Sequence, residues 1–228
     1  MKNCWRLADW IWISGLPRGK DLGNWRPKSL IDLTQRELTT VRRSCEKYGI
    51  EYLKRPITYD MEGAENAVES VLTAKTPVLV HCFNGRDRAP VVCRRAIMRR
   101  QGEVVLHGVG RNLARSYRLC ASFGIPTLKT HECTGQLAGN LYSAADTVIA
   151  RSIDVLPDPS QETIWLDQSG SIRLRDVDWL SVRRIVVGGE SCGLPPGGGD
   201  RVRIDHQNKL ELTVESALAI ALYAWSWA

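Results

Sequence analysis

The stretch from residue 78 to residue 88 constrains the fold of this chain more than any other. An apolar run at residues 78–80 ends abruptly in His81-Cys82, and five residues separate Cys82 from Arg88. A short apolar run that stops at a polar loop is typical of a buried strand, and the segment after Arg88 has the composition of a helix. A strand, a short loop and a helix start together make the layout of an anion site.

This layout predicts an anion site that carries its own nucleophile. Backbone N–H groups of the loop can converge on one anion, helped by the partial positive charge at the start of the next helix. The same field favours thiolate over thiol, so Cys82 is the expected nucleophile. Arg88 can hold two phosphate oxygens through its planar guanidinium. The predicted phosphate-binding residues are Phe83, Asn84, Gly85, Arg86, Asp87 and Arg88.

The motif His81-Cys82-x5-Arg88, with Gly85 inside the loop, resembles the cysteine-dependent tyrosine and dual-specificity phosphatases. The resemblance implies a phosphocysteine intermediate and a general acid, an Asp on the loop after the strand that precedes the nucleophile strand. Asp60 stands in that place and can protonate the leaving oxygen.

Two residues are rivals of Asp60 as the acid: Asp87, inside the loop, and more weakly Glu62. The chain departs from the family at Ala89, where Ser or Thr usually helps the thiolate to leave in the second step.

Strands and helices are expected to alternate through this first half, which predicts an α/β fold with a mostly parallel sheet and its site at the carboxyl ends of the strands. A capping box of Thr34 and Glu37 is expected to start one helix. Gln101-Gly102 interrupts the last helix, so we expect a phosphatase-like domain at 1–102 and a second domain at 103–228. The expected strands are 10–14, 29–34, 49–53 and 78–81, and the expected helices run to residue 48 and over 64–74 and 89–100.

The second half carries three motifs that resemble the SPOUT RNA methyltransferases of the TrmH/SpoU branch. The first is a strand at 103–107 followed by Asn112-Leu113, Arg118 and Phe123-Gly124. The second is an apolar strand followed by Gly-x-Glu-x-x-Gly-Leu at residues 188–194. The third is a short strand, a loop and an alanine-rich helix within residues 203–223. The resemblance implies an α/β domain with a trefoil knot.

The same resemblance implies S-adenosylmethionine as cofactor, RNA as partner and a homodimer formed through the SPOUT domain. Glycines let the backbone approach a ligand closely, and apolar side chains would complete the walls. Arg118 is the implied catalytic arginine, and with Asn112 it would contact RNA. The implied cofactor-binding residues are Val187, Gly188, Gly189, Glu190, Gly193, Ile204, Leu210, Leu212 and Thr213.

The third motif departs from the family at Glu211, where an Asn is usual. An ionised Glu only accepts hydrogen bonds, whereas Asn also donates. Our leading interpretation is a bifunctional enzyme: a cysteine phosphatase fused to a methyltransferase that acts on the ribose 2′-oxygen of RNA. The alternative is a phosphatase of phosphotyrosine or phosphoserine proteins, whose SPOUT half is a non-catalytic RNA-binding or dimerisation module. A third interpretation makes the first half a phosphate-recognition module that serves the methyltransferase.

Charge favours an anionic partner. The net charge is +6 and the pI about 9.0, consistent with RNA or a phosphorylated substrate. The segments 31–34 and 49–54 are also similar to the RNA 5′-triphosphatase members of the phosphatase superfamily. We therefore expect that the phosphate lies on RNA 5′ ends.

The seven cysteines include no C-x-x-C pair, so neither a metal site nor a disulfide framework is expected. Reduced thiols predict a cytoplasmic location. The apolar stretch at 10–13 is too short and too close to charges for a signal peptide or a membrane span.

Overall fold

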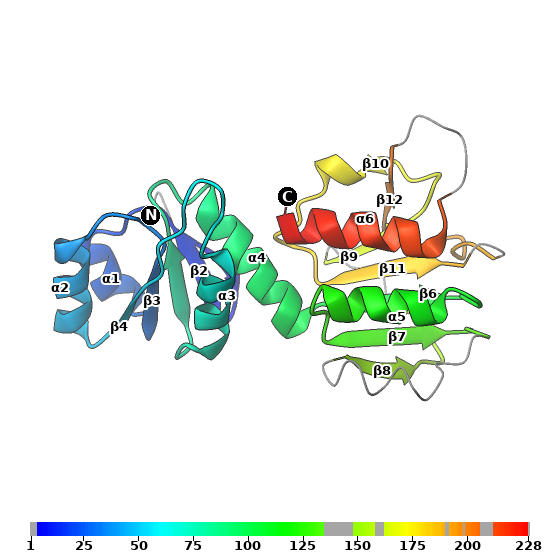
Figure 1. Ribbon diagram of the computed structural model, residues 1–228, viewed down its shortest axis with the longest axis horizontal. Coiled ribbons are helices and arrows are strands. Elements are labelled where there is room, and N and C mark those ends of the chain that lie inside the picture. The colour runs from blue at the N-terminus through cyan, green and yellow to red at the C-terminus, as the bar shows by residue number, and fades with distance from the viewer. Residues whose placement is uncertain are drawn as a thin grey trace. The chain divides into compact units, whose positions relative to one another are not determined.

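The computed structural model describes residues 4–134, 148–157, 162–189, 192–197, 199–205 and 212–227. The chain forms two compact units, residues 1–96 and 97–228. Each unit is built on one sheet with helices packed against it (Figure 1). The division between the units falls inside one helix, α4, whereas the boundary expected from the sequence lies just after the end of that helix.

The sheet of the first unit has the strand order β1-β2-β5-β3-β4. β5 lies in the middle and pairs in parallel with β2 and with β3, and β4 continues the parallel set. Only β1, at the edge, is antiparallel. The carboxyl ends of four strands therefore meet at one edge of the sheet. The strands are β1 (Cys4–Ala8), β2 (Ile11–Ser14), β3 (Ser29–Asp32), β4 (Glu51–Lys54) and β5 (Val78–His81).

Four helices cover this sheet. Leu30 and Leu79 point to one face, where they form a core with Leu22, Val41 and Cys45 from α1 and α2. Figure 1 shows α3 and α4 on the opposite side of the sheet. The helices are α1 (Gly19–Trp25), α2 (Thr39–Tyr48), α3 (Ala64–Thr73) and α4 (Arg88–Gln101).

The predicted capping box of Thr34 and Glu37 is wrong. Leu38 occupies the N-cap position of α2, and no side chain caps this helix. Both the amide and the hydroxyl of Thr34 donate instead to Asp32 Oδ1, at 2.8 and 2.7 Å. The Thr34 oxygen, which would have to accept a backbone N–H in a capping box, instead accepts a hydrogen bond from Lys54 Nζ at 3.0 Å.

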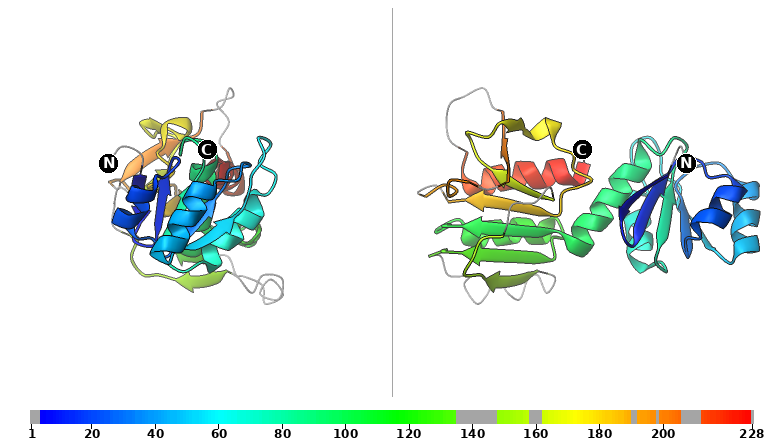
Figure 2. Two further views of the ribbon diagram at one scale, coloured as in Figure 1. Left: turned by 90° about the vertical axis from the view of Figure 1, so that its left-hand side faces the viewer. Right: turned by 180° about the vertical axis from the view of Figure 1, so that it is seen from behind.

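The second unit has a sheet of seven strands in the order β10-β12-β9-β11-β6-β7-β8, and every strand pair is parallel. Helices α5 (Leu113–Ser122) and α6 (Val214–Trp227) lie side by side on one face, and the view from behind shows the strands uncovered by either (Figures 1 and 2). The strands are β6 (Glu103–His107), β7 (Thr127–His131), β8 (Ile149–Ser152), β9 (Thr163–Leu166), β10 (Ile172–Arg173), β11 (Arg184–Gly188) and β12 (Asp200–Arg203), with a 3-10 turn at Leu174–Asp176.

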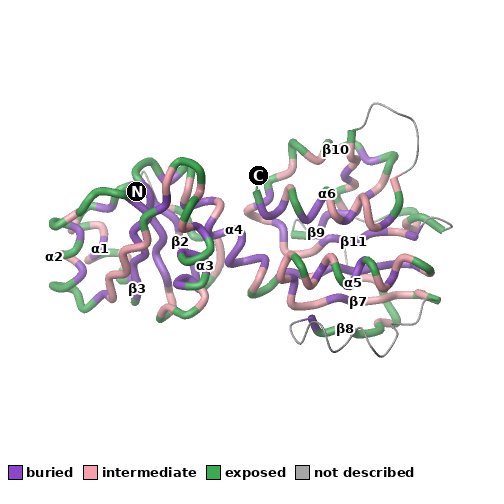
Figure 3. The backbone as a smooth tube through the Cα atoms, in the orientation of Figure 1, coloured by how far each residue is buried: buried purple, intermediate pink, exposed green. Residues whose placement is uncertain are grey.

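Burial follows this arrangement (Figure 3). The central strands β6 and β11 are buried over most of their length. On the face away from α5 and α6, the loop residues Ile153, Leu156 and Leu194 pack on a small apolar cluster of Val105, Trp165 and Val186. On α6, Trp225 is fully buried in the core, whereas Tyr223 and Trp227 are exposed. None of the helices in the described ranges is both long enough and apolar enough to cross a membrane.

The predicted fold class is confirmed: both units are α/β, and the sheet of the first unit is mostly parallel, as expected. The strands β1, β8, β9 and β10 and the helix α1 were not predicted, because their segments are only two to seven residues long. The predicted knot depends on the course of residues 206–211, which lie outside the described residues, so the knot stays a prediction.

Candidate functional sites

Cys82 lies where β5 passes into the loop, and its side chain is buried in the centre of the first sheet. The backbone N–H of Gly85 donates to the Cys82 sulfur at 3.2 Å. α4 begins at Arg88, after a loop of the predicted length. The strand, loop and helix therefore follow one another as the sequence predicts, and the loop bends back over its own cysteine.

Gly85 makes this bend possible. Its φ is +71°, and a Cβ at this position would lie 2.5 Å from the backbone nitrogen of Gly15. Only glycine accepts both the left-handed backbone and this contact. The connection after β2 packs on the loop here, and Leu16 N–H donates to the Phe83 carbonyl at 3.1 Å. Two loops therefore brace each other above the sheet.

The Arg88 side chain is held by two backbone carbonyls. Its Nη1 donates to the carbonyl of Ile57 at 2.8 Å and to that of Leu33 at 3.4 Å. Nε and Nη2 make no hydrogen bond within the part of the chain that the structure describes. One edge of the guanidinium is thus fixed, and the Nε–Nη2 edge is left for two oxygens of an anion.

The other predicted loop residues face outward. Phe83, Asn84, Arg86 and Asp87 are all exposed, so the outer side of the loop is open to solvent. Asp60 is also exposed and lies in a turn after β4.

The connection that carries Asp60 borders the site, because Ile57, three residues earlier, binds Arg88 through its carbonyl. Glu62, the weaker rival, is exposed on the same turn, and its N–H donates to the Thr58 hydroxyl at 3.1 Å.

A buried polar network lies beneath Cys82, and the sequence did not reveal it. Asp32 accepts hydrogen bonds from Tyr52 at 2.5 Å and from Lys54 at 2.8 Å through Oδ2. Its Oδ1 lies 3.5 Å from Nε2 of His81, the residue before the nucleophile. Neighbouring parallel strands bring these residues together, because Asp32 pairs with His81 on one side and with Lys54 on the other.

Burial and neighbouring polar groups together determine the protonation states of His81 and Asp32. Burial lowers the pKa of His81, although the Asp32 carboxylate opposes this. Burial alone would raise the pKa of Asp32, but His81, Lys54, Tyr52 and Thr34 outweigh it, and the pKa is lowered. At neutral pH, Asp32 is therefore ionised and His81 is neutral, and Lys54 supplies the compensating positive charge.

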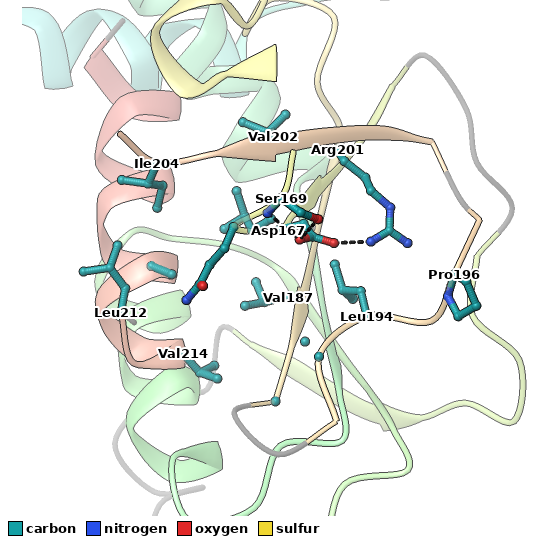
Figure 4. Close-up of a pocket in the computed structure, with 16 residues that line it drawn as sticks. Asp167, Ser169, Val187, Leu194, Pro196, Arg201, Val202, Ile204, Leu212 and Val214 are labelled. Carbon is teal, nitrogen blue, oxygen red and sulfur yellow. Dashed lines mark hydrogen bonds and ion pairs between the residues drawn. The ribbon is translucent and has the colours of Figure 1, made fainter. Parts of the chain in front are cut away.

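The second unit contains a cavity of about 680 Å³ at the carboxyl ends of β9, β11 and β12 (Figure 4). Six predicted cofactor residues line it: Val187, Gly188, Gly189, Gly193, Ile204 and Leu212. Thr213 is not part of the lining, and its hydroxyl instead accepts the N–H of Ser216 at the start of α6. Glu190, Leu210 and Glu211 lie outside the described residues.

The cavity also has a charged side that the sequence did not reveal. Arg201 pairs with Asp167 (Figure 4). Its Nη2 donates to the carbonyls of Pro195 and, at 2.7 Å, Gly197. Burial alone would raise the pKa of Asp167, but Ser169 and Arg201 outweigh it, and the pKa is lowered. Ile204 and Leu212 form the apolar side. An Asp directly after the apolar run at 163–166 was the only local signal.

Packing alone requires a glycine at position 189. A Cβ on Gly189 would lie 2.2 Å from the Gly108 carbonyl oxygen. The Gly189 N–H donates to the His107 carbonyl at 2.7 Å. The loop after β11 is therefore locked against the end of β6, and no larger residue fits at this position.

The predicted RNA-contacting residues lie on α5. Asn112 occupies the N-cap position, and Arg118 is exposed one and a half turns further on. The Arg118 guanidinium forms no ion pair with any residue in the described ranges. Arg115, on the same helix, is already engaged with Glu215 of α6 at 2.9 Å. Arg118 is thus available to an external anion.

No protein-family model matches the chain, and no curated protein matches its sequence. Solved structures do resemble it. The PP-IP phosphatase SIW14 from S. cerevisiae is 21% identical, over 42% of this chain and 67% of its own, with a TM-score of 0.38. The A. aeolicus TrmH/SpoU tRNA modifying enzyme is 19% identical, over 61% and 81%, with a TM-score of 0.47. A probable methyltransferase from Bordetella pertussis is 17% identical, over 57% and 96%, with a TM-score of 0.47.

The chain is therefore similar in structure to cysteine-based phosphatases and to TrmH/SpoU methyltransferases, the two resemblances expected from its motifs. These similarities concern the fold. The chemistry depends on the residues of the two sites.

The lowered pKa of His81 predicts a loss of stability in acid. An unfolded chain, with an ordinary His pKa of about 6.5, takes up a proton there that the folded chain resists, so folding weakens as the pH falls below that value. Hydrogen exchange of peptides from β3 and β5, corrected for intrinsic exchange rates, should show protection decreasing between about pH 6.5 and 5. His81→Asn should flatten this dependence. An equal slope in the variant would contradict the assignment to His81.

Proposed function

We propose that the first unit is a cysteine-dependent phosphatase. The observation that carries this proposal is the buried Cys82 sulfur, bound by the Gly85 N–H at 3.2 Å in the loop that joins β5 to α4. In the first step the Cys82 thiolate attacks phosphorus, and the bond from phosphorus to the leaving oxygen breaks. Asp60 gives that oxygen a proton. Water then hydrolyses the phosphocysteine and regenerates the thiolate.

Arg88 stabilises the charge that develops on the transferred phosphoryl group. The carbonyls of Ile57 and Leu33 fix its Nη1 before substrate arrives, so little reorganisation is needed in the transition state. Ala89 is buried in the first turn of α4 and has no hydroxyl to assist departure of the thiolate. We therefore expect hydrolysis of the phosphocysteine intermediate to be slower than its formation.

The proposed substrate is a phosphorylated 5′ end of RNA. The net charge of +6 and the pairing with a unit of methyltransferase type support this choice. A phosphotyrosine or phosphoserine protein is the competing substrate. The free cysteines of this chain suit a reducing compartment, and we propose a cytoplasmic location on that ground.

Replacing the nucleophile tests the mechanism. Cys82→Ser should lower kcat by about 10³-fold or more, and Arg88→Lys by about 10²-fold, since lysine lacks the planar pair of donors. Phosphate release is to be measured from 5′-triphosphate RNA and from a phosphotyrosine peptide. Cys192→Ser, an exposed thiol in the other unit, is the control and should keep full activity. Full activity in Cys82→Ser would exclude the mechanism, and release from the peptide alone would exclude the RNA substrate.

The general acid is distinguished by the leaving group. Asp60→Asn should slow the first step strongly for an alkyl phosphate, whose leaving oxygen needs a proton, and only weakly for p-nitrophenyl phosphate. Single-turnover rates are to be measured for both substrates in the wild type and the variant. We expect the rate for the alkyl ester to fall by about 10²-fold in Asp60→Asn. Asp87→Asn is the matched variant and should affect both substrates alike. If Asp87→Asn instead shows the selective loss, Asp87 is the acid.

We further propose that the second unit binds S-adenosylmethionine and methylates the ribose 2′-oxygen of RNA. The supporting observation is the cavity of about 680 Å³, lined by six of the predicted residues from the loops after β11 and β12. Arg118 and Asn112 would contact the RNA.

We also propose that this unit forms a homodimer. The apolar side chains of Ile220, Tyr223 and Trp227, exposed on α6, support a partner surface there. Trp225 is buried within its own unit and takes no part in that surface.

One sequence feature favours a second function for this unit. Glu211 stands where the resembling family has Asn, and an ionised carboxylate at the transfer site suits methyl transfer poorly. On this reading the unit binds RNA or dimerises the phosphatase without transferring methyl groups.

Calorimetric titration with S-adenosylmethionine separates the two functions. We expect a Kd on the order of 1 µM, about −8 kcal/mol. Ala217 lines the cavity from α6, so Ala217→Trp should fill the site and abolish binding. Ala219→Trp, the same change on the same helix but outside the lining, should bind as the wild type does. No binding by a folded wild-type protein would favour the non-catalytic module.

A further inference from the structure

A cluster of three metal-ligating side chains lies at the carboxyl ends of β6 and β7. His107 and His131 are the last residues of these adjacent parallel strands and pair directly in register. Their Nδ1 atoms lie 2.9 Å apart. The Glu132 carboxylate oxygen Oε2 lies 3.7 Å from Nδ1 of His107 and 3.9 Å from Nδ1 of His131.

These three distances match a coordination triangle. A point equidistant from the two nitrogens and the oxygen lies about 2.1 Å from each atom, within the range of about 2.0–2.2 Å for Zn–N and Zn–O bonds. The donor set of two imidazoles and one carboxylate is typical of zinc sites that keep an open fourth position. That point lies in the plane of the three atoms, so a tetrahedral ion requires the two Nδ1 atoms to move apart and Oε2 to move closer, each by about half an ångström.

The surroundings of the histidines support this reading. Nε2 of His131 lies 3.2 Å from the backbone carbonyl of Asp154, which orients the ring and leaves its Nδ1 lone pair for a ligand. Histidines that bind metals almost always donate their other N–H to such an acceptor. The His107 ring is nearly buried, so its position is held by packing.

The backbone of Glu132 brings the carboxylate back over the rings. Its φ is +52°, in the left-handed region that non-glycine residues seldom adopt. The chain turns out of β7 at this residue, and the side chain returns toward both Nδ1 atoms. A hydrogen bond between two neutral imidazoles accounts for their short spacing, but it does not account for a carboxylate directed at both rings.

We propose that His107, His131 and Glu132 bind a divalent transition-metal ion of the zinc type. The site adjoins the cavity, because the His107 carbonyl accepts the N–H of Gly189. The cysteine pattern led us to expect no metal. The ligands come instead from the ends of two strands, too far apart along the chain to form a local spacing motif.

Zinc titration of the full-length protein, freed of metal by a chelator and dialysed, tests the proposal. Calorimetry should show one equivalent of Zn²⁺ bound and no binding of Mg²⁺, which prefers oxygen ligands. His131→Gln and Glu132→Gln should lose this binding. Glu37→Gln, an exposed carboxylate in the other unit, should retain it. Cys82→Ser should also retain it, which separates the site from the reactive thiol.

Cobalt provides an independent readout. Co²⁺ bound at the site should give the intense visible absorption of a four-coordinate ion, and this absorption should disappear in His107→Gln. Three outcomes would overturn the proposal: no zinc bound at 100-fold excess, one equivalent retained in the His107→Gln/His131→Gln double variant, or the weak spectrum of six-coordinate Co²⁺. The Glu132→Gln variant keeps the test valid if a histidine variant fails to fold, because Glu132 is exposed.

Discussion

The parallel pairing of β5 with β2 and β3 is the constraint on which the first site depends. Parallel strands end at the same edge of a sheet, so the connections after all of them must share that edge. The connection after β2 braces the Cys82 loop, and those after β3 and β4 supply the carbonyls that hold Arg88. The Cys82 loop and the Arg88 guanidinium are thereby held by three separate connections, and Gly85 allows the loop to close.

The same pairing places a buried charge network beneath the nucleophile. Asp32 has no exposure to solvent, and a carboxylate in such a place is costly unless it is paired and hydrogen-bonded. Tyr52, Lys54 and Thr34 meet that requirement, and His81 completes the set. The hydrogen bonds of Asp32 with Tyr52 and Lys54 tie the ends of β3 and β4 together, and backbone pairing in the sheet holds His81, at the end of β5, beside Asp32. Rigid support of this kind is what a preorganised anion site needs.

The second unit is also built on parallel strands, but the loops at their carboxyl ends enclose a cavity. Its strands also end at one edge, and the loops after β9, β11 and β12 enclose a cavity with one apolar and one charged side. Arg201 joins Asp167 to the carbonyls of Pro195 and Gly197, so the rim of the cavity is attached to two strands. Gly189 packs against the end of β6 and so connects the cavity to the neighbouring histidine cluster.

The sequence by itself determined those parts whose signal is local. Apolar runs and loop length indicated the Cys82 loop and the parallel sheet of the first unit, and the resemblance of three motifs to a known family indicated the α/β class of the second unit and six residues of its cavity. The predicted Thr34 cap was wrong, because a local pattern does not reveal that Lys54, on the neighbouring strand β4, binds the Thr34 oxygen. The tertiary structure alone decided the Asp32 network, the Arg201–Asp167 pair and the meeting of His107 with His131. These contacts join residues on different strands, and strand order and register, which no short stretch encodes, set which side chains become neighbours.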